Sequence, residues 1–151
     1  MSDDPYRLQR FLDAQDRGGA HRRALAELRA GRKSGHWIWF VFPQVAGLGR
    51  SEMSRYYAIA SLAEAQAYLN HAVLGARLRE AAAAVLSTRG HSADEMLGSI
   101  DAVKLRSSMT LFHRAAPDEP LFLEVLDRFF GGRADDATDA ILDEPGGGGA
   151  T

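Results

Sequence analysis

Apolar side chains recur along most of the chain at intervals of three and four residues, the spacing of one face of an α-helix. In residues 71–88, for example, Leu74, Leu78, Ala81 and Val85 follow one another at spacings of four, three and four. The pattern therefore predicts an all-α array of about eight or nine short helices. Similar stripes place the other helices at about 5–17, 20–30, 51–59, 61–70, 93–97, 99–114, 121–130 and 136–142.

Residues that favour helix ends flank these stripes. Asp4, which precedes a proline, is typical of an N-cap. Serine followed three residues later by glutamate, at 61–64 and 92–95, matches the capping box, in which each side chain bonds the other residue's free backbone amide. Asp135 or Asp136 is expected to cap the last helix. These caps predict the residues at which helices start, which the periodicity alone does not define.

Residues 36–42, with the sequence HWIWFVF, are the one segment that could be a strand by residue type. Pro43 ends the run, and no second run offers a partner strand. An isolated strand would leave its backbone groups unpaired, so we expect a helical turn or a minor extended piece. Both tryptophans of the chain lie here, which indicates the centre of the core.

The length and composition fit one folded domain. We expect a single helical domain at 4–143 and a disordered glycine-rich tail at 145–151. The absence of cysteine excludes disulfides, thiolate catalysis and cysteine zinc sites. The five histidines show no metal-binding spacing, so neither a metal nor a cofactor is expected.

Charge and hydropathy narrow the classes of partner. A formal net charge of −2 predicts no general binding to nucleic acid. No apolar run approaches the roughly 18 residues of a membrane span, so no membrane partner is expected. The first residues are acidic and lack the apolar stretch of a signal peptide, which favours a cytoplasmic location. The sequence does not indicate a particular protein partner.

The aromatic segment is the first candidate for function. Trp37 and Trp39 could simply fill the core, because indoles carry large apolar areas. Alternatively they form a platform on which a base or sugar stacks, with His36 and Gln44 supplying polar contacts.

The second candidate is the sequence GLGRS at 47–51, which leads into a predicted helix. Gly47 and Gly49 would let the backbone approach a ligand, and Arg50 is suited to phosphate. Free amides at a helix start, here after Ser51, attract anions. The segment lacks the Gly-Lys-Ser/Thr ending of a P-loop, and the alternative is an ordinary turn before a capped helix.

The third candidate is a polar stripe within the predicted helix at 99–114. Asp101, Lys104 and Ser108 fall at i, i+3 and i+7 and thus share one face, with Ser107 beside them. A surface ion pair is the alternative interpretation. The hydroxyls weaken helix propensity without an obvious packing gain, and such departures often mark a site.

The same residues resemble a bacterial family catalogued as domain-of-unknown-function family 1810, some of whose members carry a calpastatin-like label. The resemblance lies in residues 36–44 (HWIWFVFPQ), 47–49 (GLG) with Ser51, 57–59 (YAI), 64–65 (EA), 68–69 (YL), 74–78 (LGxRL) and 101–112 (DxxKLxSSMTLF). It extends over about residues 4–142. It implies a compact α-helical fold and brings no established activity. Ala72 stands where the family usually has proline, at a predicted helix start.

Residues 68–74, together with a later acidic residue before a polar stretch, are much more weakly similar to the NADAR family. That family consists of helical N-glycosidases that act on ADP-ribose-type conjugates. The similarity implies a class of ligand rather than a reaction.

These observations lead to one main hypothesis and one alternative. The main hypothesis is a protein that binds, and as an enzyme would hydrolyse, a phosphorylated nucleotide-like or ADP-ribose-type ligand. Residues 47–51 would hold phosphate with Lys104 and the neighbouring serines, and Asp101 would activate water or stabilise positive charge. The loop and the polar stripe should then face one cavity. The alternative is a non-catalytic protein–protein interaction module with a helical groove as its surface.

Overall fold

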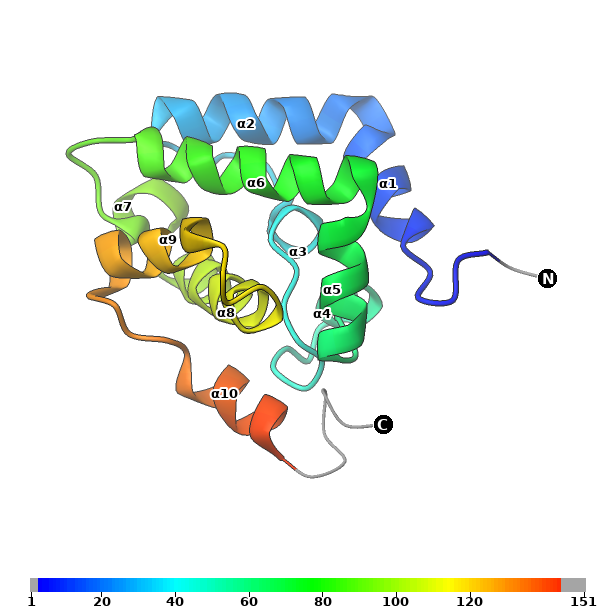
Figure 1. Ribbon diagram of the computed structural model, residues 1–151. Helices are drawn as coiled ribbons and strands as arrows, with labels where there is room; N and C mark the ends of the chain where they lie inside the picture. The colour runs from blue at the N-terminus through cyan, green and yellow to red at the C-terminus, as the bar shows by residue number, and fades with distance from the viewer. Residues whose placement is uncertain (1–2, 145–151) are drawn as a thin grey trace.

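The computed structural model describes residues 3–144, so the glycine-rich tail predicted at 145–151 lies outside the described residues. The fold is all-α, as predicted (Figure 1). In the described residues the only β-type pairing is an isolated parallel bridge between Val45 and Ile59. The helices are α1 (Gln9–Asp16), the 3₁₀ turn η1 (Arg17–Gly19), α2 (Ala20–Ala30), α3 (Ile38–Val41), α4 (Glu52–Tyr56), α5 (Leu62–Asn70), α6 (Ala72–Ser87), α7 (Ala93–Leu97), α8 (Ser99–Ala115), α9 (Pro120–Phe130) and α10 (Asp136–Asp143).

The two longest helices, α6 and α8, organise the packing. Helix α2 runs beside α6, and α8 packs against α5, α7, α9 and α10 (Figure 1). The single turn α3 lies between these groups and contacts α1, α6 and α8. None of the helices in residues 3–144 is long and apolar enough to cross a bilayer.

The aromatic segment lies in the core, as its composition predicts. It forms the short helix α3, and Ile38, Phe40, Val41 and Phe42 are buried. Trp37, just before the helix, has only 3% of its surface exposed. These residues belong to one cluster of buried apolar side chains that most of the helices share.

Trp39, by contrast, is partly exposed and packs against the edge of that cluster.

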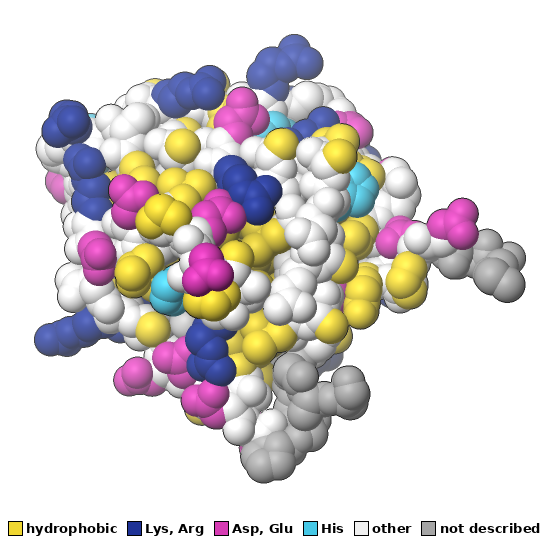
Figure 2. Space-filling model, viewed as in Figure 1, with side chains coloured by type: hydrophobic (Ala, Val, Ile, Leu, Met, Phe, Trp, Pro, Cys, Tyr) yellow, Lys and Arg dark blue, Asp and Glu magenta, His cyan; other side chains and the backbone are white. Residues whose placement is uncertain are grey.

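On the face shown in Figure 2, acidic and basic side chains are interspersed, without a single basic patch.

Most predicted helix ends are confirmed by hydrogen bonds. Ser92 and Glu95 form a complete capping box at the start of α7. Ser51 caps α4, and Asp135 caps α10 by accepting from the backbone N–H of Thr138. These interactions connect residues three positions apart, which is why the sequence alone shows them.

The first helix begins later than Asp4 and its proline suggest. Asp4 does bond the helix start, since its carboxylate accepts from Leu8 N at 2.7 Å and from Gln9 N at 2.9 Å. However, the intervening residues form a turn closed by the Arg7 N–H and the Asp4 carbonyl, and α1 starts only at Gln9. The prediction of a helix from residue 5 was therefore wrong by about one turn.

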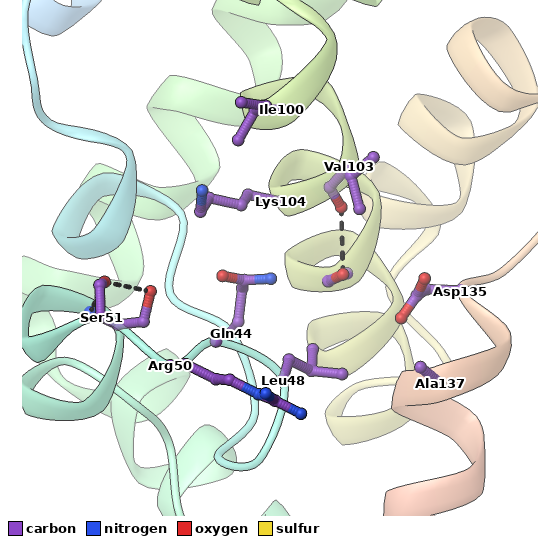
Figure 3. Close-up of a pocket in the computed structure, with 12 residues that line it drawn as sticks. Gln44, Leu48, Arg50, Ser51, Ile100, Val103, Lys104, Asp135 and Ala137 are labelled. Atoms are coloured by element: carbon purple, nitrogen blue, oxygen red, sulfur yellow. Dashed lines mark hydrogen bonds between the residues drawn. The ribbon is translucent and has the colours of Figure 1, made fainter.

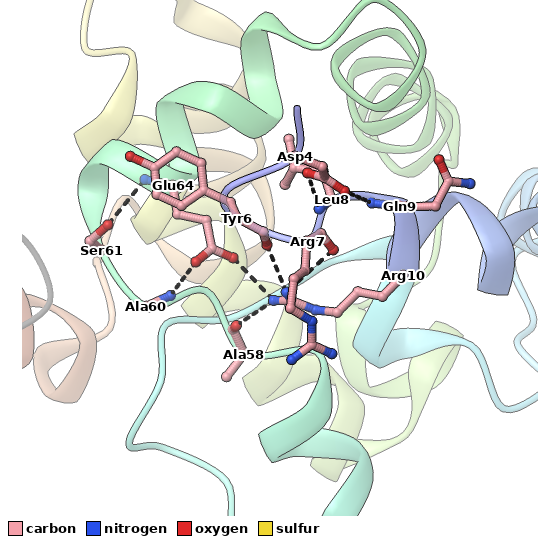
Figure 4. Close-up of polar contacts among 10 residues, drawn as sticks. All are labelled: Asp4, Tyr6, Arg7, Leu8, Gln9, Arg10, Ala58, Ala60, Ser61 and Glu64. Carbon is pink, nitrogen blue, oxygen red and sulfur yellow. Dashed lines mark hydrogen bonds and ion pairs between the residues drawn. The ribbon is translucent and has the colours of Figure 1, made fainter. Parts of the chain in front are cut away.

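The second predicted capping box is only half formed, because Glu64 has other partners (Figure 4). Ser61 accepts from the Glu64 N–H, but the Glu64 carboxylate accepts from Ala60 N at 3.1 Å and pairs with Arg10 at 3.1 Å. The Arg10 and Glu64 side chains are only 9% and 5% exposed. Arg10 also donates to the Ala58 carbonyl at 2.9 Å, so this pair ties α1 to the start of α5.

His21 on α2 should make stability depend on pH. It is buried against α6, where Nε2 lies 3.1 Å from a carboxylate oxygen of Glu80. Burial lowers the pKa of His21 below 6.5 and outweighs the hydrogen bond to Glu80, which raises it; Arg77 lowers this pKa further and Asp16 raises it. The unfolded chain therefore binds the proton more readily than the folded chain.

The expected result is that the contribution of His21 to the free energy of unfolding is fully present above pH 6.5 and is lost as the pH drops below that value. Urea unfolding at pH 7.5 and at 5.5, in the parent and in His21→Gln, measures this effect. The variant should lose less stability between the two pH values than the parent does. An equal loss in both proteins would show that His21 is not responsible.

Candidate functional site

A cavity of about 510 Å³ lies between the loop before α4, the first half of α8 and the start of α10 (Figure 3). Its size is within the range of small-molecule sites in proteins. Figure 3 shows Gln44 near its centre, with Lys104 above it, Arg50 below it and Asp135 on the far side. The lining residues are Gln44, Leu48, Gly49, Arg50, Ser51, Ser54, Ile100, Val103, Lys104, Ser107, Asp135 and Ala137.

The loop wall of the cavity is held by backbone pairing and by a close contact. Ala46 N donates to the Ile59 carbonyl and Ile59 N donates to the Gln44 carbonyl, both at 2.8 Å. Gly49 packs directly on Ser54, and a Cβ at position 49 would lie 2.4 Å from the Ser54 Cβ. Glycine at 49 is therefore required by this close approach, which sets the shape of the cavity.

The opposite wall is fixed by side chains of α8. Arg106 donates to the carbonyls of Arg133 and Ala134, each at 2.9 Å. The Thr110 hydroxyl accepts from Asp135 N at 2.9 Å. Helix α8 thus holds the connection between α9 and α10 and places Asp135 at the cavity.

Lys104 is the basic side chain that α8 contributes to the cavity. Asp101, one turn earlier, lies 3.7 Å from the Lys104 Nζ and 2.8 Å from the Lys33 Nζ. Lys33 and Lys104 are the only lysines of the chain, so Asp101 lies between them. Asp101 does not line the cavity itself and instead holds the lysine that does.

The cavity brings the predicted loop together with Lys104 and Ser107 of α8, but Asp101 and Ser108 of the predicted stripe do not line it. Gly47 lines a smaller cavity of about 200 Å³ on the same loop. Ser108 is fully buried, and its hydroxyl has no hydrogen-bond partner among the described residues. The predicted ligand residues that line the larger cavity are Gln44, Gly49, Arg50, Ser51, Lys104 and Ser107.

The aromatic residues lie elsewhere. His36 and Trp37 line a separate cavity of about 330 Å³, which also contains Arg17 and Arg23. The indole N–H of Trp37 donates to the Glu27 carboxylate at 2.9 Å. Trp39 lines neither this cavity nor the one with Lys104. The structure therefore does not bring the tryptophans to the basic residues of the loop and stripe.

Sequence reasoning missed two kinds of lining residue, a carboxylate and a set of apolar side chains. Asp135 was recognised only as a helix cap. Ile100 and Val103 are apolar yet 73% and 57% exposed, and they form the rim on α8 together with Leu48 of the loop. Apolar residues outside the buried stripe of a helix could have indicated such a rim.

The cavity combines basic, hydroxyl and apolar groups with one carboxylate. Arg50 forms no ion pair with any residue in 3–144. One oxygen of Asp135 accepts from the backbone N–H of Thr138 at 2.9 Å and from its hydroxyl at 2.6 Å. No group of three or more His, Asp or Glu side chains in the described part of the chain is arranged to hold a metal ion. The arrangement can bind an anion beside an apolar wall.

Comparisons with known proteins agree with this fold. The crystal structure of the conserved hypothetical protein Rv1873 from Mycobacterium tuberculosis is similar, with a TM-score of 0.91 and 48% sequence identity, over 94% of this chain and 100% of that one. No curated protein matches the chain. A family model described as "Protein of unknown function (DUF1810)" matches residues 5–142. Because that match spans nearly the whole chain, the protein belongs to the DUF1810 family.

Proposed function

We propose that the cavity at Arg50 and Lys104 binds a small phosphate-bearing ligand of the nucleotide or ADP-ribose type. The observation that carries this proposal is the convergence of two basic side chains from distant parts of the sequence on one cavity with an apolar rim. Arg50 comes from the loop before α4, and Lys104 comes from α8. A phosphate satisfies both charges, while the uncharged part of the ligand covers the rim.

In this proposal, different lining residues bind different parts of the ligand. The guanidinium of Arg50 offers a planar pair of donors that matches phosphate, and Lys104 adds a compact positive charge. The Gln44 amide, in the centre of the cavity, can bond a ribose or a base edge. Leu48, Ile100 and Val103 supply the apolar surface against which a planar base lies.

An enzymatic version of the proposal uses Asp135. Cleavage of an N-glycosidic bond passes through a positively charged sugar, which a nearby carboxylate stabilises while it orients or activates water. Asp135 lines the cavity, whereas Asp101 is engaged with the two lysines. We therefore assign Asp101 to positioning Lys104 and give the catalytic part to Asp135.

Removing either basic group should weaken binding of ADP-ribose and AMP. Lys104→Gln and Arg50→Gln are each expected to raise the Kd about 10- to 100-fold, the effect of losing one charge-assisted hydrogen bond of about 1.5–3 kcal/mol. Isothermal titration calorimetry measures the Kd, and a ligand-induced rise in Tm gives a first screen.

Arg29→Gln is the matched control, because Arg29 is exposed on α2 and lies outside this cavity. Adenosine, which lacks phosphate, should bind the parent more weakly than AMP and should respond little to Lys104→Gln. If ADP-ribose and AMP bind the parent and both cavity variants with the same Kd, the proposed phosphate site is wrong.

The exposed apolar pair on α8 favours a second candidate, a surface for another protein. Ile100 and Val103 face outward at the mouth of the cavity. In the ligand proposal, Ile100→Ser with Val103→Ser weakens binding of ADP-ribose. In the interaction proposal, no nucleotide binds and the same double variant removes an association with a partner protein. The calorimetric titration of the parent separates the two.

A further inference from the structure

A second basic cavity lies on another part of the molecule and is independent of the function proposed above. It has a volume of about 360 Å³ and lies between the N-terminal turn, the end of α4 and the start of α5. Three arginines, Arg7, Arg10 and Arg55, line it with a single carboxylate, that of Glu64. This local excess of positive charge contrasts with the net charge of −2 of the whole chain.

Arg10 uses the Glu64 carboxylate and two backbone carbonyls at this cavity as hydrogen-bond acceptors (Figure 4). Arg10 donates to the Tyr6 carbonyl at 2.8 Å, to the Ala58 carbonyl at 2.9 Å and to one carboxylate oxygen of Glu64 at 3.1 Å. The other Glu64 oxygen accepts from Ala60 N at 3.1 Å. The buried pair therefore forms the floor of the cavity, and its carboxylate bonds Arg10 and Ala60 N rather than Arg7 or Arg55.

The donors of the other two arginines are not used in this way. Neither Arg7 nor Arg55 forms an ion pair with the residues in 3–144, and no side-chain hydrogen bond joins either guanidinium to them. Arg7 lies with its guanidinium 5.4 Å from the centre of the Tyr56 ring. A cavity whose acceptors are engaged and whose cationic donors are available is matched to a ligand rich in acceptors, which means an anion.

The backbone at Arg7 supports a positioned arginine. Its φ angle is 54°, and among the described residues it is the only non-glycine residue with a positive φ. This conformation is uncommon for a residue with a long side chain. It is set by the turn in which Arg7 N donates to the Asp4 carbonyl at 3.1 Å. Arg7 then lines the same cavity as Arg10 and Glu64.

We propose that this cavity is a second anion site and that it takes a phosphate group between Arg7 and Arg55. A carboxylate is satisfied by one guanidinium fork, whereas the oxygens of a phosphate can serve two forks at once. Arg10 does not bind the anion directly. Its role is structural, because the ion pair that it forms with Glu64 is the floor of the cavity.

The test is a titration with inorganic phosphate, followed by the ¹H–¹⁵N signals of the arginine side chains and of the backbone amides at constant ionic strength. The expected result is a saturable shift of the Arg7 and Arg55 side-chain signals and of the amides at 58–60. Arg7→Gln and Arg55→Gln should each raise the Kd for phosphate about 10-fold or more, as expected for one lost charge-assisted contact. Acetate should shift the same signals less.

Two control variants keep the outcome specific. Arg29→Gln, on exposed α2, and Lys104→Gln, in the other cavity, should leave the phosphate titration at Arg7 and Arg55 unchanged. Shifts that grow without saturation, an equal response to acetate, or the same weakening in Arg29→Gln would each overturn the proposal. Because Arg7 and Arg55 are exposed, both variants are expected to keep the parent circular dichroism spectrum. If one of these two variants does not keep that spectrum, the phosphate titration of the other variant still tests the proposal.

Discussion

Replacing Glu64 with leucine is expected to lower the free energy of unfolding by about 3–5 kcal/mol, the effect of leaving one partner of a buried ion pair without its counter-charge. The Arg10 guanidinium would remain buried at 9% exposure, with only carbonyl acceptors around it. The Ala60 N–H would also lose its acceptor. Urea unfolding followed by circular dichroism measures the change.

Two further variants separate charge from packing at this site. Glu64→Gln keeps an oxygen for Ala60 N or Arg10 and should cost less than Glu64→Leu. The double variant Arg10→Met with Glu64→Leu removes both charges and should recover part of the loss, because no unpaired charge is then buried. Recovery should be incomplete, since the Tyr6 and Ala58 carbonyls lose their donor. A parent-like urea midpoint for Glu64→Leu would contradict this account of the pair.

Replacing Trp37 with alanine is expected to cost a similar amount, about 3–5 kcal/mol, the usual range for removing a buried large aromatic side chain. Trp37 is 3% exposed and packs near Phe42, with ring centres 6.4 Å apart. Trp39→Ala is the natural comparison, because Trp39 is only partly buried and should cost less. A larger loss for Trp39→Ala than for Trp37→Ala, measured by urea unfolding, would contradict the placement of the core.

Trp37→Phe removes the hydrogen bond to Glu27 but keeps a six-membered aromatic ring in the core. The Glu27 oxygen that accepts from the indole also accepts from Ser34 N at 2.7 Å and Gly35 N at 2.8 Å. Burial raises the pKa of the Glu27 carboxyl, but the hydrogen bonds from Gly35, Ser34 and Trp37 together lower it. Because two of the three donors remain, Trp37→Phe should cost much less than Trp37→Ala.

The helices and their ends could be predicted because they depend on neighbours in the sequence. The Ser92–Glu95 box is correct because both of its hydrogen bonds connect residues three apart. Glu64 was predicted to complete the same motif, but it instead pairs with Arg10, 54 residues away. A long-range partner of this kind leaves no trace in a local pattern. The delayed start of α1 likewise depends on a turn that Asp4 stabilises.

The candidate site could be predicted in part for the same reason. The loop residues Arg50 and Ser51 and the α8 residues Lys104 and Ser107 do line one cavity. Helical spacing correctly placed Asp101 beside Lys104, but it could not show that Lys33 approaches the same carboxylate more closely.

The composition of the aromatic segment indicated that its side chains are buried, but it did not indicate which cavity they border. Tryptophans are expected in a core wherever they lie, so their residue type could not reveal that His36 and Trp37 border a different cavity. Asp135 was recognised as a helix cap, a role that is local. Its place at the cavity depends on Arg106 and Thr110 of α8, which hold the preceding connection.

The most direct test of the central proposal is to map ADP-ribose on the protein by the shifts of backbone amide signals in a ¹H–¹⁵N titration. The proposal predicts saturable shifts at 47–54, in the loop and the first turn of α4, in α8 at 100–107 and near Asp135, which are the walls of one cavity. Lys104→Gln should reduce them at equal ADP-ribose concentration, while Arg29→Gln should not. Shifts confined to 17–23 and 36–40, around the cavity that Trp37 lines, would contradict the proposal, as would a titration without shifts.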